Sequence, residues 1–395
     1  MLRIIGRILS GIGTILLFAV IALCLAIALV PPFLDRIYYT GSMSGHYDGQ
    51  HFFNPDGIDD LASPQPGRSR SSFVARWLLG ADDRPAWPEK VTVTPSRPQI
   101  TVPPGQMRAT WVGHATVLIQ VEGLNILTDP IWSDHASPFP PLGPKRVTAP
   151  GIGFDDLPKI DLVVVSHNHY DHMDLPTLKR LWERDRPLIV TSLGNDTLIA
   201  GAGVTSRALD WGQSITVQPG VRVHVTRNHH WSSRWGTDRN RAFWSSFTIE
   251  TPAGNIFFAG DTGAGDMKWP VEARRYGPIR LALIPIGAFR FYAGQMSTST
   301  HVGPREAVDI FDGLKASYAI PIHWATFRLS YEAYDTPPRM LDLFMRCAGL
   351  NPRRFGRQDI GRPITVPMYS ASEKTAPSID PAICRDGSKA LRILQ

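Results

Sequence analysis

Three histidines and two aspartates crowd into the stretch SHNHYDHMD, from Ser166 to Asp174, directly after the apolar run IDLVVV. Neutral imidazole is the commonest metal ligand in proteins, and carboxylates are its usual complement in zinc sites. His167 and His169 are two residues apart, so on an extended segment their side chains point the same way. Asp171 and His172 follow at once and can turn toward a second point. The spacing therefore predicts two metal ions rather than one.

Further ligand-type residues stand at the ends of three predicted strands: His230 in VTRNHHW, Asp261 in NIFFAGD and His323 in AIPIHW. Together with the first cluster they can be divided between two metals, with Asp261 as a bridge. The first metal then takes His167, His169 and His230, and the second takes Asp171, His172 and His323. Each metal keeps room for a shared water, as a catalytic site requires.

Two other polar residues are candidates for supporting roles. Asp129 in LTDP is predicted to orient a ligating histidine through the second ring nitrogen, with a simple turn aspartate before Pro130 as the alternative. His114 in VGHATVL either lies near the metals or is a hydrogen-bonded structural histidine.

The elements that must position these residues follow from the hydrophobic pattern. From about residue 107 onward, short apolar runs rich in β-branched residues alternate with helical stretches at 175–185, 303–315 and 337–349. The early strands follow one another closely, and the later strands are separated by helices. This order predicts an α/β fold, with two mixed sheets packed face to face and helices outside, a four-layer αββα sandwich.

The predicted domain spans residues 106–368. Before it, residues 35–105 form a Pro/Gly-rich linker, within which the basic and aromatic segment 70–80 is either an amphipathic helix lying on lipid or a short packed helix. Residues 369–395 are predicted to be a loose tail. The three cysteines, Cys24, Cys347 and Cys384, show no metal-type CxxC spacing and no obvious disulfide framework.

Residues 1–34 are predicted to form a membrane anchor. No charge occurs from Ile8 to Leu34, a run longer than the ~20 apolar residues that span a bilayer. Arg3 and Arg7 precede it, so the N-terminus is expected in the cytoplasm and the catalytic domain on the outer, periplasmic or extracytoplasmic, side. A cleaved signal peptide is the alternative.

The motifs HNHYDH, GDTG and IHW, in this order, resemble the metallo-β-lactamase superfamily. Within it, segments such as TWVGHATVLIQ, LTDPIW, HHWSSR and IHWATF resemble the N-acyl-phosphatidylethanolamine-hydrolysing phospholipases D, over residues 105–365. The resemblance implies the αββα sandwich, two zinc ions (with iron or manganese as alternatives) and a membrane phospholipid as substrate. It places the ligand at His230 rather than His229. It also implies catalytic roles for Asp171, Asp261 and His301.

Some functions remain open at this point. His301 either assists as an acid, binds a phosphate oxygen or supports the following helix, and Lys145 and Arg146 either contact phosphate or belong to a solvated loop. A lactonase or other small-molecule metallo-hydrolase is the alternative activity, and a flavodiiron-type redox protein is disfavoured because His169 replaces the expected glutamate. A homodimer is possible. The net charge of +6 is spread out, without the basic cluster that nucleic-acid binding requires.

Overall fold

The computed structural model describes residues 2–57, 84–291, 300–371, 374–376 and 379–385. Its first sheet has seven strands in the order β13-β1-β2-β3-β4-β5-β6. The strands are β1 (Met107–Gly113), β2 (Thr116–Val121), β3 (Leu124–Thr128), β4 (Leu162–Val165), β5 (Leu188–Ser192), β6 (Arg207–Leu209) and β13 (Pro363–Thr365). Pairing is antiparallel from β13 to β3 and parallel from β3 to β6.

The second sheet has six strands in the order β12-β11-β10-β9-β8-β7. They are β7 (Ser214–Gln218), β8 (Val221–Thr226), β9 (Ser246–Glu250), β10 (Asn255–Phe258), β11 (Ile279–Pro285) and β12 (Tyr318–Ile322). Pairing is antiparallel from β7 to β10 and parallel from β10 to β12. Both sheets are therefore mixed, as the sequence predicts.

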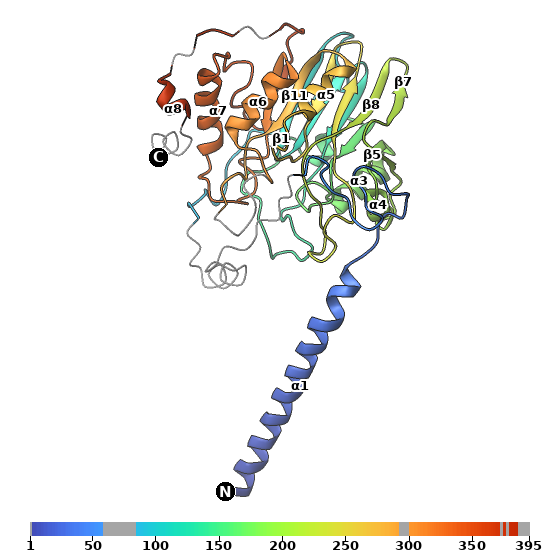
Figure 1. The fold of residues 1–395 in the computed structure, drawn as a ribbon, viewed down its shortest axis with the longest axis vertical. Coiled ribbons are helices and arrows are strands. Elements are labelled where there is room, and N and C mark those ends of the chain that lie inside the picture. Colours follow the sequence, from blue (N-terminus) through green and yellow to red (C-terminus); the bar gives the residue numbers. More distant parts are fainter. Residues whose placement is uncertain (1, 58–83, 292–299, 372–373, 377–378, 386–395) are drawn as a thin grey trace.

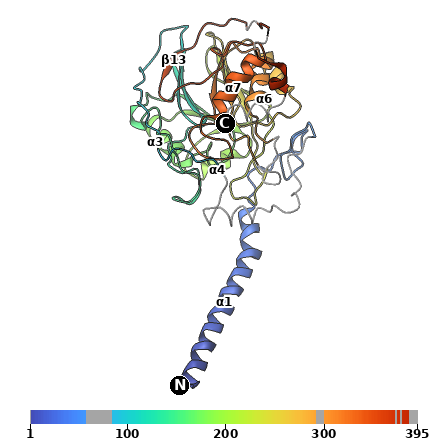
Figure 2. The ribbon, with the colours of Figure 1, turned by 90° about the vertical axis from the view of Figure 1, so that its left-hand side faces the viewer.

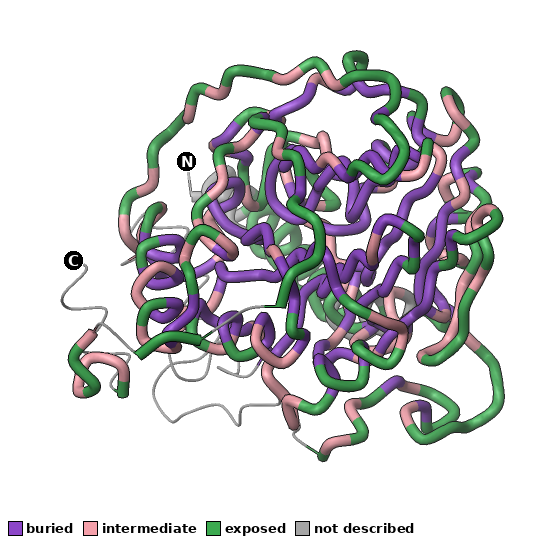
Figure 3. The backbone as a smooth tube through the Cα atoms, turned by 90° about the horizontal axis from the view of Figure 1, so that it is seen from above, coloured by how far each residue is buried: buried purple, intermediate pink, exposed green. Residues whose placement is uncertain are grey.

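Alternating side chains show that both faces of the first sheet are covered. On β2, Val117 and Ile119 belong to the large core shared with the second sheet, whereas Leu118 belongs to a separate core with Leu178 and Leu181 of helix α3 (Leu175–Asp185). Such two-sided burial is typical of sheets with helices on one face and a second sheet on the other. Figure 3 shows the buried residues gathered in the middle of the domain.

The helices lie outside the two sheets. They are α3 (Leu175–Asp185) and α4 (Asn195–Ala200) beside β5, and α5 (Trp269–Ala273), α6 (Pro304–Leu314) and α7 (Thr336–Cys347) beside the second sheet, with short 3₁₀ turns at Phe154–Asp156 and Arg274–Tyr276. The three helices predicted from sequence are present within two residues of the expected bounds. The prediction of two packed sheets with outer helices is confirmed.

Helix α1 (Leu2–Leu34) extends away from the domain (Figures 1 and 2). A membrane-spanning helix must be both long enough and apolar enough to cross about 30 Å of hydrocarbon. Among the described residues, no helix meets both requirements. The predicted single-pass anchor is therefore wrong, and so is the placement of the catalytic domain on the outer side of a membrane.

Residues 35–57, predicted to belong to a linker, pack against the domain. Tyr47 and Phe52 are buried with Phe243 and Trp244 in a core of their own. The guanidinium of Arg241 donates two hydrogen bonds, each 2.8 Å long, to the Asp35 carboxylate. The segment is therefore part of the folded unit. The candidate amphipathic segment 70–80 lies outside the described residues.

The end of the chain is tied to the domain as well. Cys347 at the end of α7 and Cys384 in α8 (Pro381–Arg385) form a disulfide, and these residues are 37 positions apart in sequence. No local sequence pattern indicates this pairing, because it depends on α8 lying against α7. Part of the predicted loose tail is thus covalently attached.

Candidate metal centre

The candidate ligands meet at one edge of the sandwich because they follow strands whose carboxyl ends share that edge. His167 comes shortly after β4, and Asp129 comes directly after its parallel neighbour β3. Asp261 follows β10 and His323 follows β12, two strands that both run parallel to β11. Side chains after the carboxyl ends of parallel strands commonly form the binding site of α/β proteins.

The first group contains His167, His169, His230 and Asp261, whose potential ligand atoms all lie within 4.8 Å of one another. Nε2 of His167 lies 2.8 Å from Nδ1 of His169. Nε2 of His230 and Oδ1 of Asp261 are buried, and no hydrogen-bond partner for either atom exists among the described residues. Buried acceptors that converge without a donor between them suit a cation.

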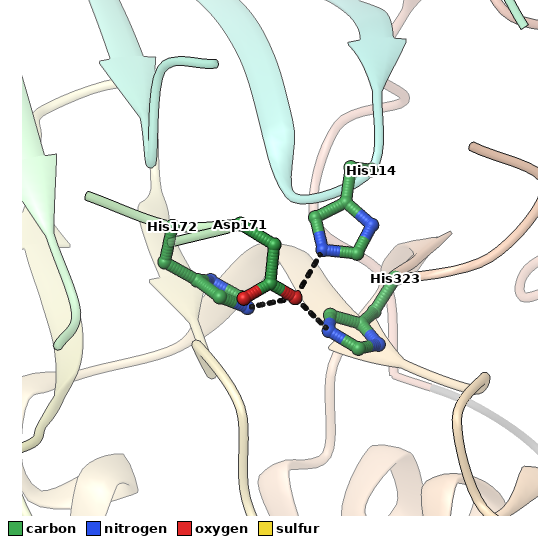
Figure 4. A group of neighbouring side chains, drawn as sticks. All are labelled: His114, Asp171, His172 and His323. Atoms are coloured by element: carbon green, nitrogen blue, oxygen red, sulfur yellow. Dashed lines mark hydrogen bonds and ion pairs between the residues drawn. The ribbon is translucent and has the colours of Figure 1, made fainter. Parts of the chain in front are cut away.

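The second group surrounds the Asp171 carboxylate (Figure 4). Oδ2 of Asp171 lies 2.9 Å from Nε2 of His114, 3.5 Å from Nε2 of His172 and 3.4 Å from Nε2 of His323. These four residues form a second set with ligand atoms within 4.8 Å. His114 is thus the neighbour of the predicted ligands and adds a fourth side chain to the second group.

Asp261 connects the two groups. Its Oδ2 lies 3.0 Å from Nε2 of His172 and 3.0 Å from Nε2 of His323, while the same carboxylate belongs to the first group. Its side chain is only 1% exposed. The structure therefore brings all seven predicted ligands together, with one carboxylate in the position of a bridge.

The electrostatics of the groups agree with a place for positive charge. Although burial opposes the shift, the charge of His172 helps to hold the pKa of Asp261 well below its usual range. Burial acts to lower the pKa of His323, but the charge of Asp261 outweighs burial and helps to raise this pKa to about 9. Burial lowers the pKa of His169 to about 3. A metal ion bound here must displace the proton that His323 holds near neutral pH.

Three residues of the site have backbone dihedral angles in the left-handed region. The φ angle is 53° at His114, 32° at Asp129 and 64° at His323. Such conformations cost a non-glycine residue on the order of 1–3 kcal/mol and cluster at functional sites. The fold therefore tolerates local strain at three residues that line the two groups.

Comparison with known proteins agrees with this geometry. Residues 124–324 match the family model described as "Beta-lactamase superfamily domain". The chain belongs to the β-lactamase superfamily. Its metallo-β-lactamase fold implies binding of a divalent metal, and the two histidine and aspartate groups are suited to hold it.

Relatives in the superfamily include named phospholipases. The chain is 34% identical, over 58% of its length and 67% of the relative, to the N-acyl-phosphatidylethanolamine-hydrolyzing phospholipase D 1 of Caenorhabditis elegans. It is 33% identical, over 62% of its length, to the mitochondrial enzyme of that name from Saccharomyces cerevisiae, of which it spans only 53%. A metallo hydrolase from Ignicoccus hospitalis shares the fold (TM-score 0.50, 20% identity, covering 66% of this chain and 98% of that chain).

Asp129 supports ligands of both groups. Its Oδ2 accepts a hydrogen bond from Nδ1 of His172 (2.6 Å) and another from the Ser166 hydroxyl (2.5 Å). Its Oδ1 accepts the backbone N–H of Ser166 (2.7 Å). The Ser166 hydroxyl in turn lies 2.9 Å from Nδ1 of His167. One carboxylate thus orients a histidine of each group, as carboxylate partners of metal-ligating histidines commonly do.

We expect Asp129→Asn to weaken metal binding at both groups by roughly 10–100-fold. Both carboxylate oxygens accept from donors, so an amide must turn its NH₂ toward Ser166 or His172. Competition with a chelator measures the affinity, and circular dichroism checks the fold. The exposed Asp134→Asn in the following loop is the control. An unchanged affinity in the Asp129 variant would contradict the orienting role.

Other predicted residues take different places. His229 turns to Asp56, with Nδ1 of the ring 2.8 Å from Oδ2 of the carboxylate, and lies in neither group. The Arg146 guanidinium is buried, donates to the Ile131 carbonyl at 2.8 Å and stacks on Phe327. It supports the loop after β3. Lys145 is exposed beside a separate surface cavity.

His301 lies at the side of the two groups. Its Nδ1 is 3.7 Å from Oδ2 of Asp261, and its ring centroid is 5.2 Å from that of His230. The side chain is 9% exposed, whereas the neighbouring ligands are almost fully covered. His301 is therefore placed where a bound substrate can meet it.

Arg234 is a supporting residue that sequence reasoning missed. Its Nη1 donates to the carbonyls of Asn168 (3.0 Å) and Met173 (2.8 Å), and its guanidinium stacks 3.6 Å from the centre of the Tyr170 ring. Its hydrogen bonds thus stabilise both ends of the loop that carries the HNHYDH residues. The signal was the arginine of HHWSSR, but no spacing rule connects it with a loop some 60 residues earlier.

Proposed function

We propose that this protein is a dinuclear zinc hydrolase that cleaves phosphodiesters, of the phospholipase D type. The observation that carries the proposal is the Asp261 carboxylate, which belongs to the first ligand group and lies 3.0 Å from two histidines of the second, His172 and His323. A shared carboxylate between two sets of histidines suits a pair of metal ions. Such a pair activates a water and stabilises the charge that develops on the phosphoryl oxygens.

The protein's own residues hold this arrangement in place. Asp129 and Ser166 fix the rings of His172 and His167, so the ligand nitrogens face their groups without reorganisation. Asp171 is held by His114 through a 2.9 Å hydrogen bond. Burial of the ligands keeps bulk water out, which strengthens electrostatic interactions with a substrate phosphate.

His301 is proposed to donate an N–H hydrogen bond to a phosphate oxygen. Burial lowers the pKa of His301 to about 4, so its imidazole is neutral at pH 7. A neutral ring has one N–H that can donate a hydrogen bond, and this N–H is too weak an acid to transfer its proton at neutral pH. Of the roles considered from sequence, this favours binding of phosphate over general acid catalysis.

The proposed substrate is N-acyl-phosphatidylethanolamine or a related phospholipid. Water attacks phosphorus, the bond to the ethanolamine oxygen breaks, and the products are phosphatidate and an N-acylethanolamine. Support comes from two relatives that carry the name of this activity and are 34% and 33% identical to this chain. Since the chain spans only part of each relative, we propose the same substrate class for this protein.

A substrate panel on the purified, metal-restored protein tests this function. The panel contains N-acyl-phosphatidylethanolamine, plain phosphatidylethanolamine, bis-p-nitrophenyl phosphate and acyl lactones. We expect cleavage of the N-acylated lipid, with phosphatidate detected by mass spectrometry. His301→Ala should raise KM more than it lowers kcat, because its hydrogen bond serves binding of phosphate.

Other outcomes of the panel separate the levels of the proposal. Turnover of lactones without any phosphodiester cleavage would replace the lipid function by a lactonase. Cleavage of bis-p-nitrophenyl phosphate alone would retain phosphodiesterase chemistry and reject the N-acylated phospholipid as substrate.

A further inference from the structure

The segment 35–57 lies outside the part of the chain that matches the superfamily model, yet it reaches a loop that carries a candidate ligand. The Tyr38 hydroxyl donates to the Asp238 carboxylate at 2.7 Å, and the Asn54 side-chain amide donates to the His230 carbonyl at 2.9 Å. Both acceptors belong to the loop that follows β8. The segment is therefore tied at two points to the loop that positions His230.

Asp56 makes a third contact with the same loop, and both partners are buried. Its Oδ2 lies 2.8 Å from Nδ1 of His229, and the two side chains are only 3% and 1% exposed. A carboxylate oxygen accepts hydrogen bonds, so Nδ1 of His229 is the donor. Because His229 directly precedes His230, this bond fixes the residue next to a candidate ligand.

The same oxygen of Asp56 also reaches a second loop. It accepts the backbone N–H of Asp266 at 3.2 Å, and Asp266 lies in the loop after β10 that also carries Asp261. The two loops touch directly as well, since the N–H of His229 donates to the Thr262 hydroxyl at 3.1 Å. One carboxylate oxygen thus joins the two loops from which the second sheet supplies ligands to the first group.

Gly265 shows how closely the second loop packs against this buried pair. Its φ angle is 52°, and a Cβ added there would lie 2.6 Å from Oδ2 of Asp56 and 2.7 Å from Nδ1 of His229. Glycine is the residue that permits both this backbone conformation and such a close approach. A side chain at position 265 would therefore push the pair apart.

We propose that Asp56 is a positioning residue of the metal centre, which holds the loops of His230 and Asp261 at the separation that the first ligand group requires. Both residues belong to that group, so a shift between their loops would change how they bind one metal ion. Hydrogen-bond partners outside the ligand set commonly tune metal affinity in this way. The inference rests on the metal centre of the proposed function and does not depend on which substrate that centre cleaves.

Asp56→Ala is expected to weaken the binding of one metal ion on the order of tenfold, as measured by competition for zinc with a chelator. Cobalt in place of zinc provides a second measurement, because the visible absorption of bound cobalt depends on the geometry of its ligands. This absorption should change in the variant while the circular dichroism spectrum stays native. Unchanged affinity together with an unchanged cobalt spectrum would overturn the proposal.

Two further variants separate the hydrogen bonds from a general effect on folding. Asp56→Asn should keep most of the affinity, because both bonds go to one oxygen and an amide oxygen can accept them. A loss as large as that in Asp56→Ala would overturn the hydrogen-bonding role. Gly265→Ala disturbs the pair from the other loop and should also weaken binding. If Asp56→Ala does not fold, normal affinity in a folded Gly265→Ala would overturn the proposal.

Asp35→Asn is the matched control, because Asp35 is a carboxylate of the same segment and pairs with Arg241 instead. Its metal affinity should stay within about twofold of the unchanged protein. An equal loss in Asp35→Asn and Asp56→Ala would overturn the specific role of Asp56, since docking of the whole segment would then be responsible. An unchanged protein that binds metal but cleaves no phosphodiester would refute the proposed activity alone and leave this comparison of affinities valid.

Discussion

Replacing Asp261 with alanine is expected to abolish hydrolysis and to release bound metal. The carboxylate belongs to the first ligand group and lies 3.0 Å from Nε2 of His172 and of His323 in the second. Without it, the first group has no carboxylate, and His172 and His323 of the second group keep only the carboxylate of Asp171. Removal of a single preorganised charge-stabilising group typically costs 10²–10³-fold in kcat, and this change affects two groups, so we expect a loss on the order of 10³-fold or more.

Asp266→Ala is the matched control for this variant. Asp266 lies five residues later, forms a partly buried ion pair with Arg227 and belongs to neither ligand group. Elemental analysis and the phosphodiesterase assay should show it close to the unchanged protein. Full metal content in Asp261→Ala, with a native circular dichroism spectrum, would show that Asp261 is not a ligand.

The second large effect concerns the number of metal ions. The metal-replete protein should contain about two zinc ions per chain, and removal by a chelator should abolish activity until zinc is restored. His230→Ala removes a ligand from the first group only, and His323→Ala removes one from the second only. Each variant should therefore retain about one ion, as measured by elemental analysis.

His224→Ala provides the control for removal of a buried histidine. His224 is on β8, pairs with Glu250 at 2.9 Å and takes no part in either group. It should retain the full metal content. If the unchanged protein binds only one ion after metal-replete purification, the dinuclear proposal is wrong.

Much of the fold could be predicted from the sequence because its signals are local. Apolar runs of strand length and helices with proline near their first turn are visible in a single chain. The helix at residues 175–185 coincides with α3, Leu175–Asp185. The pairing of Cys347 with Cys384 was invisible by contrast, because no local pattern indicates that α8 packs on α7.

The candidate site was predicted unevenly. The HNHYDH spacing identifies a dense group of ligand-type residues, and strand ends suggest the rest. The double role of Asp129 was only half visible: sequence reasoning assigned it one histidine, whereas the structure connects it to His172 directly and to His167 through Ser166. Such a relay depends on the parallel pairing of β3 with β4, which sequence spacing does not specify.

The most serious error was the membrane anchor, which rested on the uncharged run after Arg7. The uncharged run was not sufficient evidence for an anchor, since no helix among residues 2–57, 84–291, 300–371 and 379–385 is both long and apolar enough to cross a membrane. The ligand residues were predicted by a different kind of argument. Metal coordination restricts histidine and aspartate ligands to a few geometric arrangements. An apolar run, by contrast, is compatible with many different structures.

The docking of residues 35–57 changes which substitutions are expected to be tolerated. Asn54 donates to the backbone carbonyl of His230 at 2.9 Å, and the Asp56 carboxylate contacts the ring of the preceding His229, so this segment holds a candidate ligand and its neighbour. A mutational survey of this stretch should therefore find inactive variants far from the HNHYDH motif in sequence.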